Sequence, residues 1–400
     1  MAAAASVSAP AEGIIQIELS VSAGKGAARI ENARPLGIAS RFSGKKPAEV
    51  ANLVPLVFSI CRAAQSAACA EAMENALGNA GSTRAKAIRS LLVLAETARE
   101  HALQVLHSWP RCVHAPDPAL ASASIKRLLT LDREIGKSVR NPNAIDAARL
   151  DHAISELTAI LGEAVFGELP SEWLVRRDVA ELALWARRNE TLAQTIFEYL
   201  VQTGMADAGA AEMAPLPALK PEDLRNVLCS ERPDAFGAQP VWEGLPRETT
   251  PLSRQAAHPL VESVKKRYGY GLLARLAACL AELAEIPGQM RAQAAALATA
   301  EHHAQSPARN SGSGLGFAEA ARGRLIHAVE IADGTVQRYR ILAPTEWNFH
   351  PQGAAARGLA CIALSPAARR EMLARLFITA VDPCVGYELS FNRCTKCRSA

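Results

Sequence analysis

Apolar and polar residues alternate along residues 14–35, on either side of the Gly-rich turn in "SVSAGKGA". A period of two residues is typical of a strand, and a central turn joins two such strands into a hairpin. The same pattern in "RLIHAVEIADGTVQRYRIL" predicts a second hairpin that turns at Asp333 and Gly334. The sequence therefore predicts two small sheets, one near each end of the chain.

Most of the remaining chain has helical spacing. From about Pro47 to Ala206 apolar residues recur every three or four positions, as in "LLVLAETA". Prolines then crowd residues 207–255, a second helical stretch follows, and "SPARNSGSGLG" interrupts it before a last helix at Ser365–Phe377. This order predicts a mainly α fold with small β-sheets (α+β) in a single domain, 1–400. Its expected parts are an N-terminal hairpin region (1–46), a helical region (47–206), a Pro-rich connection (207–255), a second helical region (256–310), and a hairpin, helix and C-terminal Cys motif (311–400).

Composition narrows the classes of partner. The net charge is only +4 over 400 residues and the basic side chains are scattered, so we expect no nucleic-acid partner. The most apolar run, "LLARLAACLAELAEI", is interrupted by Arg275, Glu282 and Glu285, so we expect no membrane span. The first residues lack the basic and apolar regions of a signal peptide. Nine cysteines without framework spacing are typical of a reducing compartment, and we expect a cytoplasmic protein.

Two cysteines lie at predicted helix boundaries. Cys61 in "SICRAAQSAAC" precedes one helix, and Cys384 in "VDPC" follows another. Two such cysteines can meet in space and offer soft thiolate ligands to a metal. A single Cys in an Ala-rich helix is also a common small buried side chain, so this pattern alone leaves both interpretations of Cys61 open.

Several segments, taken in chain order, resemble the large, catalytic subunit of nickel-iron hydrogenases. The resemblance covers most of the chain, thins between about 115 and 235, and implies a large-subunit-like fold. Its most specific parts are "EAARG", the hairpin that leads to "PTEWNFHP", and "DPC". The other segments are "LGIASRFSGKKPAEV", "SICRAAQSAACAEAMENALG" and "PVWEGLPRETTPLSR".

In that family four cysteines hold a nickel-iron pair, and the match places Cys61 and Cys384 at the two terminal nickel ligands. The two positions of the bridging thiolates hold Ala64 and Tyr387. Ala cannot coordinate a metal, and a Tyr oxygen is a hard donor that does not replace a bridging thiolate. The resemblance therefore implies a chain that is not an active enzyme and that is not expected to take nickel.

Two further positions differ from the family. Ala39 stands where the family has an acidic residue of its proton route, and Ser390 stands where it has a terminal His. Each difference removes a separate requirement for turnover of hydrogen.

Other family positions are retained. Arg322 matches an arginine beside the diatomic ligands of iron, Thr345 matches a Ser or Thr that hydrogen-bonds a cyanide, and Asp382 matches a nearby acid. Cyanide bound to iron accepts hydrogen bonds through nitrogen, so a guanidinium and a hydroxyl suit it. The alternatives are an ion pair of Arg322 with Glu319 on a loop, and simple turn chemistry for Thr345.

A chain that keeps the order of the family's segments but only two of its four cysteine ligands resembles the HupK/HoxV group of hydrogenase maturation proteins. That resemblance implies a scaffold that transiently carries iron with cyanide and carbon monoxide ligands. Its expected partners are hydrogenase maturation factors, small assembly chaperones and the hydrogenase large subunit. A metal-free chaperone that mimics the large subunit, and a residual hydrogenase-like enzyme, are the alternatives.

The retained cysteines match nickel ligands, so iron would have to shift its position or take another thiolate. Cys394 and Cys397 in "NRCTKC" are candidates for that ligand, and neighbouring basic residues favour thiolate there. The alternative is a C-terminal tail whose two cysteines have no specific role.

Overall fold

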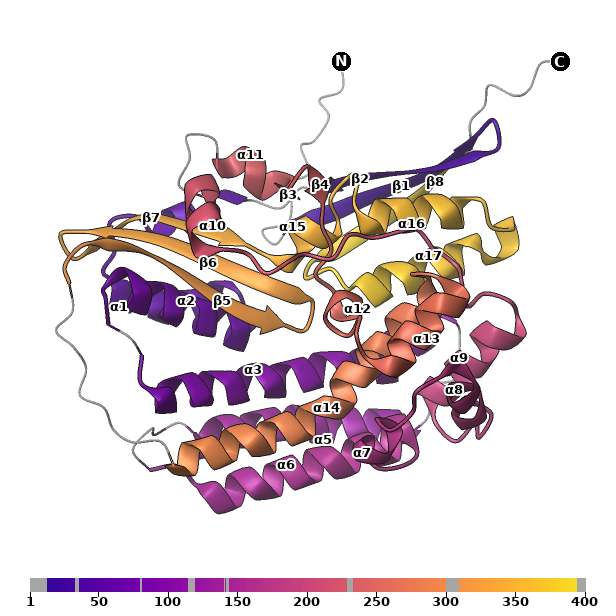
Figure 1. Cartoon of the computed structure of the whole chain (residues 1–400), viewed down its shortest axis with the longest axis horizontal. Coiled ribbons are helices and arrows are strands. Elements are labelled where there is room, and N and C mark those ends of the chain that lie inside the picture. Colours follow the sequence, from indigo (N-terminus) through magenta and orange to yellow (C-terminus); the bar gives the residue numbers. More distant parts are fainter. Residues whose placement is uncertain are drawn as a thin grey trace, which may run out of the picture.

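The computed structural model describes residues 13–32, 36–79, 81–113, 119–139, 141, 144–228, 233–299 and 309–393. A bundle of long helices forms one side of the molecule, and two three-stranded sheets with their covering helices form the other (Figure 1). The predicted α+β class, mainly helical with small sheets, is confirmed.

The bundle is built around α3 and α14, which pack against each other and against α5 and α6. α14 presents Leu and Ala along almost its whole length to this core, which explains the long apolar run in its sequence. The two predicted helical regions are thus helical, and the first is divided into many segments. The helical segments on this side of the molecule are α3 Thr83–Leu103, η2 Gln104–Ser108, α4 Trp109–Cys112, α5 Ala119–Ser138, α6 Ala147–Leu161, η3 Gly162–Phe166, α7 Pro170–Trp173, α8 Val179–Ala186, α9 Leu192–Gln202, α13 Pro259–Tyr268 and α14 Leu272–Thr299.

The first predicted hairpin is confirmed as β1 (Ile14–Ser22) and β2 (Lys25–Asn32). A third strand, β8 (Gly386–Arg393), pairs in parallel with β1 and was missed in the sequence, where this segment was interpreted only as a motif and a tail. The helices α16 (Ala354–Ala363) and α17 (Ala367–Val381) lie against this part of the molecule (Figure 1). The last predicted helix is α17, which runs beyond its expected end.

The second predicted hairpin is confirmed as β6 (Gly323–Ala332) and β7 (Thr335–Leu342). The segment interpreted as a break contains a further strand, β5 (Gly312–Ala320), which pairs with β6. Glycine at alternate positions lowers strand propensity, and this hid the strand in the sequence.

Those glycines let helix α2 (Arg62–Ala76) lie directly on β5. A Cβ atom on any of them would overlap a backbone carbonyl oxygen of α2. Side chains of α2 also satisfy the outer edge of β5, since Asn75 Nδ2 donates to Leu315 O at 2.7 Å and Phe317 N donates to Glu71 Oε2 at 2.6 Å. The facing pairs are Gly312 with Ala76, Gly314 with Ala72, and Gly316 with Ala68.

The Pro-rich connection is more ordered than the sequence predicts, because it carries short helices and a two-stranded ribbon over the second sheet. Among the described residues, none of the helices combines the length and the apolar character needed to span a bilayer. The remaining bounds are η1 Leu36–Phe42, α1 Pro47–Val57, α10 Pro221–Leu228, α11 Pro233–Ala238, β3 Val241–Trp242, β4 Leu245–Pro246, α12 Pro251–Arg254 and α15 Pro344–Asn348.

The contact of α2 with β5 predicts a strong effect of one added methyl group. Gly314→Ala should lower the free energy of unfolding by about 1–3 kcal/mol, because its Cβ meets backbone that cannot move without shifting α2. Gly288→Ala is the matched control, since an added Cβ in the exposed part of α14 meets nothing and raises helix propensity. Urea unfolding of both variants measures the difference, and equal stabilities would contradict this role of β5.

Candidate metal site

Cys61 is the N-cap residue of α2 and is half-buried. The first turn of α2 is held by the Glu96 carboxylate, which accepts from Ala63 N at 2.8 Å and from Ala64 N at 3.1 Å. A carboxylate at a helix N-terminus satisfies free N–H groups and complements the helix dipole. Burial nevertheless raises the pKa of Glu96 to about 7. Glu96 on α3 therefore fixes the segment that carries Cys61.

Cys384 follows the C-terminus of α17. The chain leaves that helix through Asp382 in a left-handed conformation (φ 59°), which Asp tolerates better than most residues. Thr345, at the start of α15, then contacts Cys384 twice. Its Oγ1 donates to Cys384 Sγ at 3.0 Å and accepts from Cys384 N at 3.3 Å. Thr345 thus holds this cysteine, which simple turn chemistry would not do.

Arg322 lies between two half-buried carboxylates. Its Nη2 donates to Glu100 Oε2 at 2.9 Å, and its Nε forms an ion pair with Asp382 Oδ2 at 3.1 Å. Burial opposes the charge, but these carboxylates raise the pKa of the guanidinium well above its ordinary value. The alternative of an ion pair with Glu319 is wrong, because Glu319 binds Arg324 instead. Arg322 is therefore a fixed buried cation rather than a loop side chain.

The two cysteines and Arg322 converge. Burial and, to a smaller extent, Cys384 raise the pKa of the Cys61 thiol to about 12, and Arg322 opposes the increase. Electrostatic interactions that shift a pKa in this way require short separations between the groups. Cys61, Cys384, Arg322, Thr345 and Asp382, which come from four distant parts of the sequence, thus form one cluster.

Four positions differ from the hydrogenase family, and the structure places each of them. Ala64 is fully buried in an apolar cluster of small residues. Tyr387 lies in β8, where its hydroxyl hydrogen-bonds Arg375 and Thr379 on α17. Ala39 is buried in the core next to α1 and α2, and Ser390 is an exposed residue of β8 opposite Glu18. Ala64 has no donor atom, so it cannot add a metal ligand to the cysteine pair.

The metal ligand set is small. Within the part of the chain that the structure describes, no three His, Cys, Asp or Glu side chains are grouped to hold a metal ion. Cys394 and Cys397, the predicted additional ligands, lie outside the described residues. The described site therefore offers two thiol sulfurs with a cation and a hydroxyl beside them.

Sequence reasoning missed the contribution of α3. Glu96, Glu100 and Gln104 are four residues apart, so they share one face of the helical segment formed by α3 and η2. Gln104 Nε2 donates to Asp382 Oδ1 at 2.6 Å, which completes the link from α3 to the end of α17. A polar stripe with period four in an Ala- and Leu-rich helix was the available signal.

The backbone before Arg322 is held by a second ionic cluster. Arg254 Nη2 donates to Ala321 O at 3.1 Å, while its Nε binds Glu282 Oε1 at 2.6 Å. His101 Nε2 contacts Glu282 Oε2 at 2.7 Å. Burial alone would raise the pKa of Glu282, but Arg254 and His101 hold it at about 2. This cluster ties α3, α12 and α14 to the Arg322 turn.

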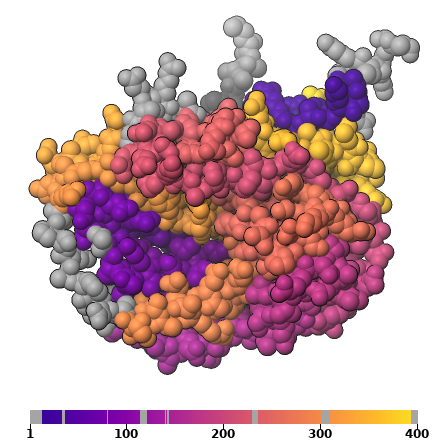
Figure 2. Space-filling view, in the orientation of Figure 1, coloured from indigo at the N-terminus to yellow at the C-terminus, as the bar shows by residue number. Residues whose placement is uncertain are grey.

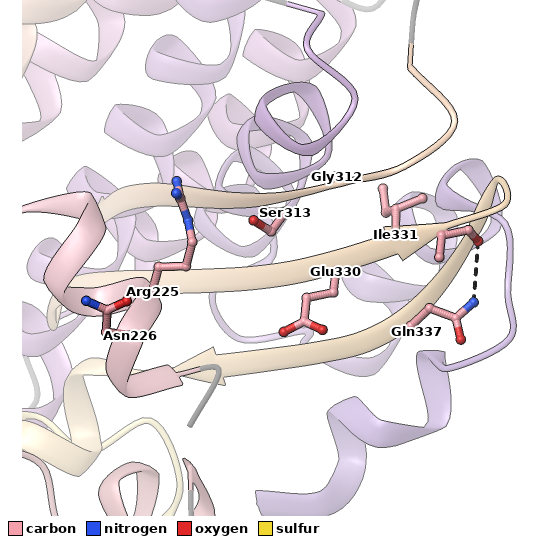
Figure 3. Close-up of a pocket in the computed structure, with 8 residues that line it drawn as sticks. Arg225, Asn226, Gly312, Ser313, Glu330, Ile331 and Gln337 are labelled. Carbon is pink, nitrogen blue, oxygen red and sulfur yellow. Dashed lines mark hydrogen bonds between the residues drawn. The ribbon is translucent and has the colours of Figure 1, made fainter. Parts of the chain in front are cut away.

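Two surface cavities lie apart from the cluster of Cys61, Cys384 and Arg322. A groove of about 520 Å³ is lined by α2, α3, α14 and β5, in the hollow between the purple and orange segments in Figure 2. A second cavity, of about 570 Å³, lies between α10 and the second sheet and is lined by Arg225, Ser313 and Glu330, among others (Figure 3). Neither cavity is lined by Cys61, Cys384 or Arg322.

Comparisons with known proteins agree with this geometry. A family model described as nickel-dependent hydrogenase matches residues 272–385. The hydrogenase expression/formation protein HoxV of Cupriavidus necator is 31% identical over 375 residues, which cover 88% of this chain and 90% of that protein. HupK of Azotobacter vinelandii, with the same description, is 30% identical, and the match covers 89% of this chain and 92% of that protein.

Solved structures show the same fold. A variant of the [NiFeSe] hydrogenase from Desulfovibrio vulgaris Hildenborough superposes with a TM-score of 0.63 at 18% identity, covering 91% of this chain and 94% of that one. The fold is thus that of nickel-dependent hydrogenases, as predicted. Within that class, the chain belongs to the family of hydrogenase expression/formation proteins that includes HoxV and HupK.

The Glu282 cluster predicts acid sensitivity. Its folded pKa of about 2 lies below the ordinary value of 4.5, so its contribution to stability is complete above pH 4.5 and is lost as pH falls through 2. Glu282→Gln should lower the free energy of unfolding at pH 7 by roughly 3–5 kcal/mol, because Arg254 then loses its main partner and keeps only Glu319, at 3.8 Å. The variant should also lose less stability than wild type between pH 4.5 and 2.

Glu262→Gln is the matched control for this change. Glu262 pairs with Lys266 at the surface, where solvent screens the pair, so the substitution should change stability little. Urea unfolding from pH 2 to 7 measures all three proteins. An equal cost for the two substitutions would contradict a structural role for the Glu282 cluster.

Proposed function

We propose that this protein acts in hydrogenase maturation as a scaffold that transiently carries iron with its cyanide and carbon monoxide ligands. The observation that carries the proposal is the convergence of Cys61 and Cys384 beside the buried cation Arg322. Membership of the expression/formation family supports the broader role in maturation. The iron fragment is the cargo of the scaffold rather than its permanent cofactor.

The small ligand set suits this cargo. An iron that already carries two cyanides and one carbon monoxide needs few further donors. Two thiolates can therefore bind this fragment, although they would bind a bare iron ion poorly. Fewer thiolates than the four of the enzyme also allow release. Because Cys61 is a thiol in the free protein, loading must displace its proton, which further limits affinity.

Arg322 and Thr345 have the chemistry to recognise the cyanides. The contacts of the two ion pairs of Arg322 use Nη2 and Nε. Its Nη1 is the N–H group that we propose donates to a cyanide nitrogen. Thr345 now donates to Cys384, and its hydroxyl would keep this thiolate in place or turn to a cyanide. Asp382 orients Arg322.

A metal-free chaperone that copies the large-subunit surface is the second candidate. The hydrogenase-like fold over most of the chain favours it, since maturation factors that bind a hydrogenase would meet a related surface here. Hydrogenase-related proteins are the proposed partners under both candidates. Iron bound to the purified protein would distinguish the scaffold from the metal-free chaperone.

Hydrogen turnover is not expected. Ala64 and Tyr387 leave no bridging thiolates, so the purified protein should neither take up nor evolve hydrogen with artificial electron carriers. Hydrogen-dependent dye reduction measures this. A rate above that of a Cys61→Ala, Cys384→Ala double variant prepared from the same cells would contradict the proposal.

Infrared spectra test the cargo. Protein purified from cells with an active maturation system should show cyanide and carbonyl bands, because these ligands absorb where protein is nearly silent. Cys384→Ala should abolish the bands by removing a primary ligand. Thr345→Val and Arg322→Lys should weaken or shift them, since loss of an outer contact costs roughly 10–100-fold in affinity.

Cys361→Ala is the matched control, because Cys361 is exposed on α16 and contacts none of these residues. Substituting Cys394 and Cys397 together tests whether the tail supplies a thiolate. If wild-type protein has no bands and hydrogenase still matures with Cys384→Ala, the iron proposal fails and the metal-free chaperone becomes the better account.

A further inference from the structure

A buried chain of polar side chains leads away from Cys61 into the core. Cys61, Gln65 and Cys69 are four residues apart and share one face of α2. That face meets His327 on β6 and Tyr339 on β7, which lie diagonally across the strand pair. Gln65, Cys69, His327 and Tyr339 are at most 4% exposed. Neither the proposed cargo nor the packing of α2 on β5 accounts for this chain.

The contacts are continuous. Gln65 Nε2 lies 3.5 Å from Cys61 Sγ, and Gln65 Oε1 lies 2.8 Å from His327 Nε2. His327 Nδ1 lies 2.6 Å from the Tyr339 hydroxyl. Cys69 and Tyr339 belong to the same buried cluster.

The protons of this chain have one consistent direction. Burial lowers the pKa of His327 to about 3, so the ring is neutral and carries one N–H. An amide oxygen accepts only, so that N–H is on Nε2, and Nδ1 must accept from the Tyr339 hydroxyl. The single proton of the Tyr339 hydroxyl is therefore used in the bond to His327. The Gln65 amide nitrogen is then left to face Cys61.

We propose that Gln65, His327 and Tyr339 form a positioning relay that holds an N–H donor against the Cys61 sulfur. A thiolate only accepts hydrogen bonds, so the relay is arranged in advance for Cys61 as an anion or a metal ligand. It plays for Cys61 the part that Thr345 plays for Cys384. Both sulfurs of the pair thus have a fixed donor, and both donors are neutral. Gln65 is a positioning residue that no family motif in the sequence marked.

Nitrogen NMR on ¹⁵N-histidine-labelled, metal-free protein tests the direction of the relay, with His327→Asn to assign the signals. We expect His327 to be neutral with its proton on Nε2. In Tyr339→Phe, which keeps the ring, Nε2 should stay protonated while the Nδ1 signal moves to that of a nitrogen without a hydrogen bond. A proton on Nδ1, a doubly protonated ring, or an unchanged Nδ1 signal in Tyr339→Phe would overturn the relay.

Alkylation by iodoacetamide at one pH, followed by mass spectrometry of the two cysteine peptides, tests its effect. Gln65→Met keeps the side-chain length but removes the donor, and it should slow alkylation of Cys61 by about ten-fold or more while Cys384 is unchanged. Thr345→Val should slow Cys384 only. An unchanged Cys61 rate in Gln65→Met would leave Gln65 a packing residue and refute the proposal. Because both experiments use metal-free protein, their outcome is independent of the cargo.

Discussion

The close approach of α2 to β5 is the constraint on which the candidate site depends. The facing pairs run in opposite directions along the two elements, since Ala76 meets Gly312 while Ala68 meets Gly316. The start of α2 therefore lies at the end of β5, beside the turn that holds Arg322. Only glycine permits this distance at the three facing positions, because a Cβ atom there would displace the helix. Cys61 reaches the other site residues as a result of backbone packing.

Ion pairs then fix the site residues that the packing of α2 on β5 brings together. Arg322 joins the turn after β5 to Glu100 on α3 and to Asp382 after α17. Arg254, which is paired with Glu282, donates to the carbonyl of the preceding residue, Ala321. Breaking buried pairs is costly, so this network gives the cysteine pair a rigid surrounding even in the metal-free protein. Rigid outer groups around a small ligand set favour selective, reversible binding.

Local patterns predicted the two hairpins and the helical regions, because turn residues and periodicity act over short distances. The same local patterns did not predict strands β5 and β8. β5 has glycines that only the partner helix explains, and β8 pairs with β1 from the far end of the chain. Periodicity alone left Cys61 ambiguous, and its grouping with Arg322 and Thr345 came from the family resemblance. Glu100 and Gln65 were missed because their partners are distant in sequence.

The central claim is that the two cysteine sulfurs hold an iron that brings its own diatomic ligands. X-ray absorption at the iron edge, on protein purified from cells with an active maturation system, tests it most directly. We expect sulfur neighbours together with the short iron–carbon distances of bound diatomic ligands, and loss of the sulfur neighbours when Cys61 and Cys384 are both replaced by Ala. An iron surrounded only by oxygen or nitrogen, or a spectrum unchanged by that double substitution, would contradict it.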